Sequence, residues 1–213
     1  MPTLSERTVD NFCERVAQQT QQFKEKLQTE VDIKGIGIGA PNGNYYKGTI
    51  EQAPNLLWGD FVPIAELMRE KMGVKATLTN DANAAAVGEM KYGVAKGMKN
   101  FVVVTLGTGL GSGIVVNGEL VYGHDGFAGE LGHTTVFPWE GRDLPTGRKG
   151  SLEAYVSAPG IKRTVFELLS IRLKPSPLRK YNFETLDATI IANAAKEGDS
   201  IALEAFDYTA TIL

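Results

Sequence analysis

A glycine-rich run between two apolar segments constrains the fold of this chain most. Residues 107–113 read GTGLGSG and follow the largely apolar segment 101–106. Segments 114–116 and 119–122 then flank Asn117 and Gly118, a pair typical of two-residue β-hairpin turns. The run therefore predicts a loop that joins strands of a meander. Backbone N–H groups in such a loop can approach phosphate oxygens, and a glycine-rich hairpin that needs positive φ is the alternative interpretation.

This loop lacks the marks of two common nucleotide-binding signatures. No Gly-Lys-Ser/Thr ends the run, as a Walker A loop requires. A strand follows it, where a dinucleotide-binding fingerprint has a helix. The loop therefore belongs to neither class, and its ligand has to be inferred from other residues.

The remaining pattern predicts an α/β chain. Segment 31–39 alternates β-branched residues with glycine, which indicates a strand with a close neighbour, and 75–79 is a second short strand. Helical periodicity or alanine content predicts helices over 6–29, 61–72, 82–92, 152–169, 187–196 and 199–213. The break between two lobes is expected near residues 93–100. The last helix has no end signal, which predicts that the chain is cut within it.

Net charge and cysteine content limit which binding partners and which cellular compartment are expected for this chain. The formal net charge of -3 gives no electrostatic argument for binding nucleic acid or an anionic membrane. The single cysteine, Cys13, excludes an internal disulfide framework and a cysteine-rich metal site, and it fits a reducing compartment. No segment approaches the ~18 apolar residues of a membrane span. We therefore expect a cytoplasmic protein without nucleic-acid or membrane partners.

Two polar residues stand where a predicted strand meets a predicted helix. Asn80 and Asp81 follow the strand at 75–79. Ligands of open α/β sheets bind at the carboxyl ends of strands, and a carboxylate there can take a proton from a substrate hydroxyl. The alternative interpretation is that Asp81 only caps the next helix.

A second polar cluster follows the hairpin. Glu130 and His133 are three residues apart, so one helical turn would place them side by side. Such a pair can bind neighbouring sugar hydroxyls, although a surface glutamate beside a structural histidine is an equally simple explanation. Glu153 opens a predicted helix, where a negative charge is also favoured by the helix dipole.

The order of these motifs resembles the ROK family of bacterial sugar kinases, notably glucokinases, and related sugar-responsive repressors. The resemblance rests on segments 37–41, 80–85, 106–113, 129–133 and 150–153. It implies an actin-like ATPase (ribonuclease H-like) α/β fold of two lobes with an incomplete small lobe. The partial small lobe would span residues 1–97 and contain the catalytic aspartate. The larger lobe would span residues 98–213.

The resemblance also implies a role for each site residue in ATP-dependent phosphorylation of a hexose. Asp81 would be the general base that takes the proton of the sugar 6-hydroxyl, and Asn80 would bind ring hydroxyls beside it. The turn at Asn42 and Gly43 would close over the sugar. Hydroxyls near the anomeric end would be bound by Glu130, His133 and Glu153. The phosphates of ATP, accompanied by Mg²⁺, would face Gly107, Thr108, Gly109 and Gly111.

Two departures from the family pattern are visible. The family has a zinc site in which the histidine joins three cysteines, but the three cysteine positions here hold Leu144, Thr146 and Ser151. Leucine cannot bind zinc, and hydroxyls are poor replacements for thiolates, so we predict no structural zinc. No Asp-x-Gly-Gly-Thr-like phosphate loop precedes Gly35. The adenosine-binding segment expected after Leu213 is also missing, so the chain is predicted to be a fragment with weak or no activity alone.

Several alternatives stay open at this level. The chain can be a non-catalytic sugar-sensing module, as in the family's repressors, or an inactive kinase fragment. Glucose is the expected sugar by resemblance, but N-acetylmannosamine, N-acetylglucosamine, fructose and allose are open as well. Family members commonly form dimers, so we expect a homo-oligomer.

Overall fold

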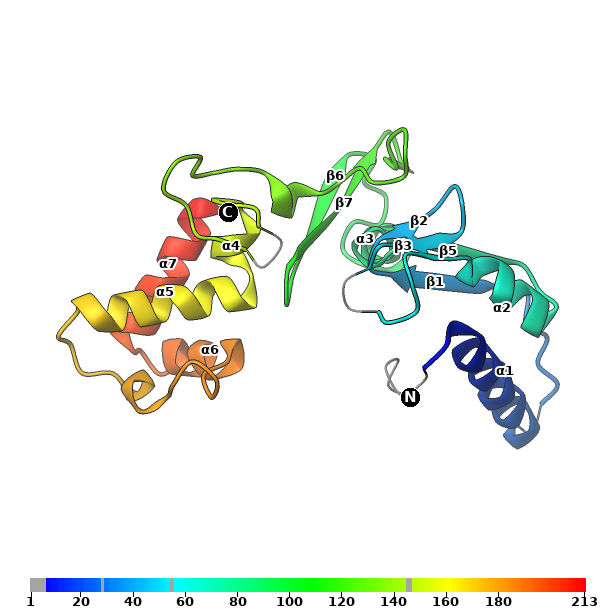
Figure 1. Ribbon diagram of the computed structural model, residues 1–213, viewed down its shortest axis with the longest axis horizontal. Coiled ribbons are helices and arrows are strands. Elements are labelled where there is room, and N and C mark those ends of the chain that lie inside the picture. Colours follow the sequence, from blue (N-terminus) through cyan, green and yellow to red (C-terminus); the bar gives the residue numbers. More distant parts are fainter. Residues whose placement is uncertain (1–6, 28, 54–55, 145–146) are drawn as a thin grey trace. The chain divides into compact units, whose positions relative to one another are not determined.

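The computed structural model describes residues 7–27, 29–53, 56–144 and 147–213, with the elements labelled in Figure 1. The chain forms two compact units. The first holds Met1–Val103 and Gly113–Gly129, and the second holds Val104–Ser112 and Glu130–Leu213. The chain therefore passes between the units within the strands on either side of the glycine loop. The lobe boundary at residue 97 remains a prediction, because a compact unit need not coincide with a lobe.

Helix α1, Val9–Lys26, opens the first unit within the range predicted for it. Thr8 caps its start, because the Thr8 side chain accepts a hydrogen bond from the Asn11 N–H. The buried face of α1 packs against α2, Ile64–Met72, in a core that contains Cys13 and Met68.

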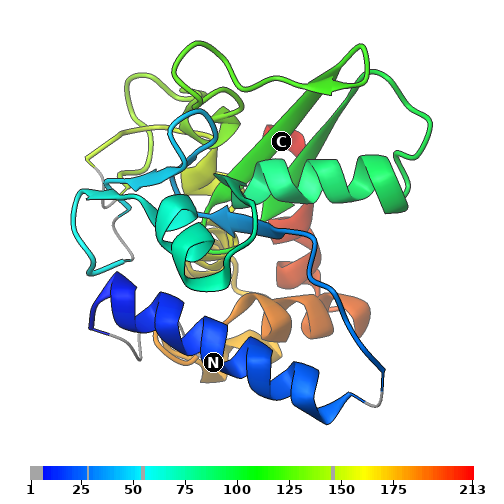
Figure 2. The ribbon, with the colours of Figure 1, turned by 90° about the vertical axis from the view of Figure 1, so that its right-hand side faces the viewer.

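A two-stranded parallel sheet forms the centre of this unit. Strand β1, Ile36–Ala40, pairs with β5, Ala76–Asn80, and Ala40 lies opposite Asn80. The strand predicted over 31–39 thus starts later than expected. Helix α3, Asp81–Tyr92, follows β5 without a loop and lies along the sheet, as Figure 2 shows. The carboxyl ends of β1 and β5 therefore lie together at the start of α3.

A small antiparallel sheet was not predicted from the sequence. It consists of β2, Gly43–Asn44, β3, Thr49–Glu51, and β4, Phe61–Val62, in the order β2-β3-β4. Ile50 and Val62 are nearly fully buried and face each other in register, so they join this sheet to the core of the unit.

The predicted meander is confirmed, but its loop is shorter than expected. Strands β6, Phe101–Leu106, β7, Leu110–Val116, and β8, Glu119–Leu120, form a sheet in that order. Asn117 and Gly118 have φ of 53° and 82°, as a type I′ turn requires. Only Gly107–Gly109 of the glycine run lies outside the strands. Gly113 is needed for packing within the first unit, because a Cβ there would lie 2.5 Å from the Ala86 Cβ.

Helices make up most of the second unit. The helix predicted over 152–169 is two helices, α4, Glu153–Val156, and α5, Ala158–Ile171. They are separated by Ser157, whose side chain accepts a hydrogen bond from the Gly160 N–H. Helices α6, Ala188–Lys196, and α7, Ser200–Ile212, pack against α5 around a shared apolar core (Figure 1). Two short 3₁₀ turns complete the unit: η2, Leu131–His133, and η3, Pro177–Lys180.

The irregular segment 134–151 is held by arginine side chains. The Arg142 guanidinium is largely buried and donates hydrogen bonds to the Gly160 carbonyl, to the Thr164 hydroxyl and to the Glu167 carboxylate. The Arg142 backbone N–H donates to the Tyr155 hydroxyl at 2.9 Å. Sequence reasoning did not single out Arg142, because nothing in its local pattern distinguishes it from a surface arginine.

Candidate functional site

Asn80 and Asp81 stand at the junction of β5 and α3. The Ala82 N–H lies 2.8 Å from Asn80 Oδ1 and 2.8 Å from Asp81 Oδ1. Asn80 is the N-cap residue of α3, whereas Asp81 is the first residue of the helix and is exposed. The alternative interpretation made Asp81 the cap of this helix, but the N-cap residue is Asn80. Asp81 presents its carboxylate to solvent at the carboxyl end of the sheet, where a ligand can reach it.

The turn at Asn42 and Gly43 packs directly onto this junction. Asn42 has a φ of 51°, and its side chain donates to the Gln52 carbonyl at 3.1 Å. A Cβ at position 43 would lie 2.5 Å from the Thr79 carbonyl oxygen, so only glycine allows this approach. The turn is therefore next to Asn80 and Asp81, as the resemblance implies.

A buried asparagine that the sequence analysis missed holds this turn in place. Asn44 is fully buried, and its Nδ2 donates to the Asp125 carbonyl at 2.9 Å. Its Oδ1 accepts from the Tyr46 and Lys47 N–H groups at 3.1 and 3.2 Å. The only sequence signal was its place in a turn-forming run, which gave no indication of burial.

Aromatic rings flank the same turn. The Tyr45 and Tyr122 rings stack with centroids 4.1 Å apart and planes 13° apart. Burial raises the pKa of the Tyr122 hydroxyl above its usual value, and the neighbouring Tyr45 adds to the shift. The Tyr46 hydroxyl donates to the Gly123 carbonyl at 3.1 Å. These contacts tie residues 44–46 to residues 122–125 of the same unit.

The second unit contains the Glu130 and His133 pair. His133 Nε2 lies 3.7 Å from Glu130 Oε2, and both side chains are about two-fifths exposed. His133 Nδ1 is buried and has no hydrogen-bond partner among the described residues. The His133 carbonyl accepts a hydrogen bond from Arg148 at 2.8 Å. The start of the 3₁₀ turn thus places imidazole and carboxylate side by side, and both groups are partly exposed.

Glu153 lies beside the glycine loop. Its Oε2 accepts a hydrogen bond from the Leu110 N–H at 2.8 Å. The loop is also held at Gly107, whose carbonyl accepts from the Ala158 N–H at 2.8 Å. Gly107 and Thr108 are exposed, whereas Gly109 and Gly111 are half-buried. The loop is thus fixed to α5 at Gly107 and to α4 at Leu110, while Gly107 and Thr108 remain exposed between these two points.

The predicted site residues therefore fall into two groups. The structure brings together one group within the first unit: Asn42, Gly43, Asn80 and Asp81. It places the other within the second unit: Gly107, Thr108, Gly109, Gly111, Glu130, His133 and Glu153.

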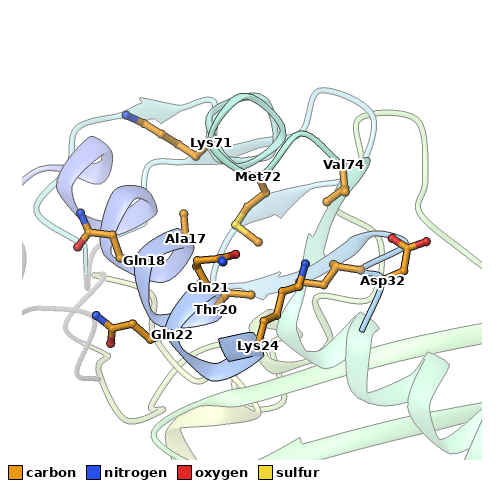
Figure 3. A pocket seen from close by; sticks show the side chains of 11 residues that line it. Ala17, Gln18, Thr20, Gln21, Gln22, Lys24, Asp32, Lys71, Met72 and Val74 are labelled. Atoms are coloured by element: carbon orange, nitrogen blue, oxygen red, sulfur yellow. The ribbon is translucent and has the colours of Figure 1, made fainter. Parts of the chain in front are cut away.

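A hollow of about 560 Å³ in the first unit lies away from all of these residues. Figure 3 shows side chains of α1, with Lys71, Met72 and Val74, around it. Its lining is mostly amide, charged and small side chains, and no predicted site residue contributes to it. The candidate site is therefore assigned from the chemistry of its side chains and not from this hollow.

The residues present do not fit a structural zinc. Of the three cysteine positions, Leu144 and Ser151 offer no thiolate or imidazole, and Thr146 lies outside the described residues. Within the described part of the chain, no three His, Cys, Asp or Glu side chains gather as a metal site. The absence of zinc remains a prediction.

The described part of the chain contains no helix with the length and hydropathy of a membrane span.

Comparison with known proteins gives one family. The model of the ROK family matches residues 3–213. A glucokinase from Halalkalibacterium halodurans is 38% identical over 188 residues, which cover 87% of this chain and 57% of that relative. The chain spans about half the length of the curated relatives it matches.

Two solved structures are similar over almost the whole chain. One is a ROK family transcriptional regulator, a homolog of the E. coli MLC protein, with a TM-score of 0.83 and 25% identity. That match covers 97% of this chain and 52% of the regulator. The other is a ROK family glucokinase from Streptomyces griseus in complex with glucose and AMPPNP. Its TM-score is 0.76 at 28% identity, and the match covers 97% of this chain and 66% of that one.

Proposed function

Since this chain belongs to the ROK family, we propose that it carries the hexose-binding core of an ATP-dependent kinase that phosphorylates the sugar 6-hydroxyl. The likeness to ROK kinase structures confirms the actin-like ATPase fold expected from the sequence. Glucose is the proposed sugar, because the Streptomyces griseus glucokinase was solved with glucose bound. The same structure holds AMPPNP, an ATP analogue, which supports ATP as the proposed donor.

The observation that carries the proposal is the exposed carboxylate of Asp81 at the carboxyl end of β5. Asp81 Oδ1 is oriented by the Ala82 N–H at 2.8 Å, so Oδ2 is the oxygen we assign to the sugar hydroxyl. Asn80 and the turn at Asn42 and Gly43 border the same point. A positioned carboxylate beside groups that hold the sugar is what general-base catalysis of phosphoryl transfer requires.

The proposed step needs little covalent chemistry from the protein. The 6-hydroxyl oxygen forms a bond to the γ-phosphorus of ATP, and the bond to the bridging oxygen of ADP breaks. Asp81 takes the hydroxyl proton, which leaves the products sugar 6-phosphate and ADP. Most of the acceleration in phosphoryl transfer comes from position and charge stabilisation, to which Mg²⁺ bound with ATP contributes when present.

Residues of the second unit have the other roles in the proposed reaction. Glu130, His133 and Glu153 accept or donate hydrogen bonds at hydroxyls near the anomeric end of the sugar. Gly107 and Thr108, the exposed residues of the glycine loop, are the part that we assign to the phosphates of ATP.

Substitution of Asp81 tests this function. With ATP, Mg²⁺ and glucose, Asp81→Asn is expected to abolish ADP release in a coupled assay while glucose affinity stays within about threefold. Glu184→Ala, an exposed glutamate of the second unit, is the control and should keep wild-type turnover. Wild-type turnover by Asp81→Asn would remove Asp81 from the role of base. A chain that binds glucose without releasing ADP would favour the inactive kinase fragment or the sugar-sensing module over a kinase that is active on its own.

A second function is favoured by one comparison. The regulator has the TM-score of 0.83, against 0.76 for the glucokinase. The alternative is therefore a sugar-sensing module that binds the hexose without turnover. A DNA-shift assay with and without sugar separates the two, because only the sensing module predicts sugar-sensitive DNA binding.

We also propose a cytoplasmic homodimer that binds neither membranes nor, as a kinase, nucleic acid. Light scattering after size exclusion tests the dimer. A thermal-shift panel of glucose, N-acetylmannosamine, N-acetylglucosamine, fructose and allose identifies the sugar, because a ligand of the folded state raises its melting temperature.

A further inference from the structure

The Glu153 carboxylate lies between the glycine loop and the Glu130–His133 turn. Its Oε2 accepts the Leu110 N–H at 2.8 Å on one side. On the other side, a Cβ at position 132 would lie 3.4 Å from Oε2 and 2.5 Å from the Leu110 carbonyl oxygen. Glycine at position 132 thus lets the 3₁₀ turn approach both the carboxylate and Leu110.

The loop itself is shaped around this carboxylate. A Cβ at position 109 would lie 2.4 Å from Glu153 Oε2 and 3.1 Å from Glu153 Cδ. A side chain there would therefore displace the carboxylate from the Leu110 N–H. Leu110 is buried, so its N–H would lose its partner without gaining water.

The remaining contacts of the loop come from the same region. The Gly107 carbonyl accepts from Ala158, and the Gly107 N–H donates to the Gly109 carbonyl at 3.0 Å. Glu153 and Ala158 are the first residues of α4 and α5. The loop is thus held at two points by the first residues of α4 and α5. The bond from the Leu110 N–H to Glu153 is the stronger of the two, because its acceptor is charged.

We propose that Glu153 is a positioning residue for the phosphate loop, in addition to the sugar contact that the proposed function assigns to it. A carboxylate has acceptor sites on both oxygens, so one oxygen can hold Leu110 while the other receives a sugar hydroxyl. Sugar binding then orders the carboxylate, and the carboxylate orders the loop that faces ATP. The coupling rests on the proposed function, but the loop-fixing role does not.

Hydrogen exchange of the Leu110 amide tests the loop-fixing role directly. Glu153→Ala should speed exchange across residues 107–110 about tenfold or more, because the amide loses its acceptor. Glu153→Gln keeps an acceptor of the same length and should stay within about threefold of wild type. Amides of α6 and α7 report whether each variant is folded, and Glu184→Ala is the matched control. The proposal is overturned if Glu153→Ala exchanges like wild type, or if Glu153→Gln exchanges as fast as Glu153→Ala.

A second variant tests the same role with Glu153 intact. Gly109→Ala should also speed exchange at Leu110, because its Cβ would displace Oε2. Unchanged exchange in Gly109→Ala would contradict the proposal even if Glu153→Ala does not fold.

The coupling to sugar has its own measurement. Glucose should slow Leu110 exchange in the wild type and should do so far less in Glu153→Ala. In turnover, Glu153→Gln should raise the KM for glucose more than the KM for ATP, whereas Glu153→Ala should raise both. No effect of glucose on wild-type exchange, in a chain that binds glucose, overturns the coupling. A chain that binds no glucose would instead refute the proposed function and leave the loop-fixing result standing.

Discussion

Replacing Asn44 with alanine tests whether the turn at the candidate site depends on one buried amide. The change removes three hydrogen bonds, to the Asp125 carbonyl and from the Tyr46 and Lys47 N–H groups. A net hydrogen bond contributes about 1 kcal/mol, so the bonds together amount to about 3 kcal/mol. Asn44 is fully buried, and water cannot easily replace these partners. We expect the free energy of unfolding of the first unit to fall by about 2–4 kcal/mol.

Urea unfolding followed by tryptophan fluorescence measures this loss. Trp58 belongs to the first unit and Trp139 to the second, where Trp139 is 87% exposed. In a Trp139→Phe background, the fluorescence therefore reports the unit that contains Asn44.

Asn182→Ala is the matched control. The Asn182 side chain also makes three hydrogen bonds, in which Oδ1 accepts from the Glu184 and Thr185 N–H groups and from the Thr185 hydroxyl, but this residue is exposed. Because it lies in the second unit, which is mostly helical, its unfolding is followed by far-ultraviolet circular dichroism. Its loss should stay below about 1 kcal/mol, because water replaces the lost partner. A loss below about 0.5 kcal/mol for Asn44→Ala would refute the reasoning, as would an equal loss in both variants.

Two further predictions concern the second unit and alkaline pH. Arg142→Met should lower the stability of the second unit by about 2 kcal/mol in urea unfolding, because it leaves the Glu167 carboxylate without its partner and removes one of the donors to the Gly160 carbonyl, which also accepts from the Thr164 hydroxyl. A chelator should leave the melting temperature unchanged. A melting temperature that falls with chelator would indicate a structural metal and contradict the prediction of no structural zinc. Because the pKa of Tyr122 is raised on folding, its contribution to stability is present below pH ~10 and is lost as pH rises through the folded-state pKa. Tyr122→Phe should therefore reduce the alkaline loss of stability reported by Trp58, and an unchanged pH profile would contradict this assignment.

Local sequence patterns predicted the elements whose signals are strong. Asn117 and Gly118 form the expected I′ turn, and α3 begins within one residue of its predicted start. These features depend on backbone conformations that a few residues decide. The polar residues predicted for the site also stand at element ends, where the sequence placed them.

Other features depend on contacts that no local pattern reveals. Strands β2 and β4 have two residues each, too few for an alternating pattern. Asn44 and Arg142 acquire their roles from partners far along the chain, such as Asp125 and Gly160. The break at Ser157 was missed because apolar periodicity continues across it, although the serine and the following proline are a recognisable helix start.

Glucose binding to the 213-residue chain tests the central claim most directly. Calorimetric titration should give saturable binding of one glucose per chain in the wild type. Glu130→Ala should weaken it about tenfold or more, whereas Asp81→Asn should stay within about threefold, because the base acts on the proton more than on affinity. Absence of binding to a chain that unfolds cooperatively in urea would contradict the account.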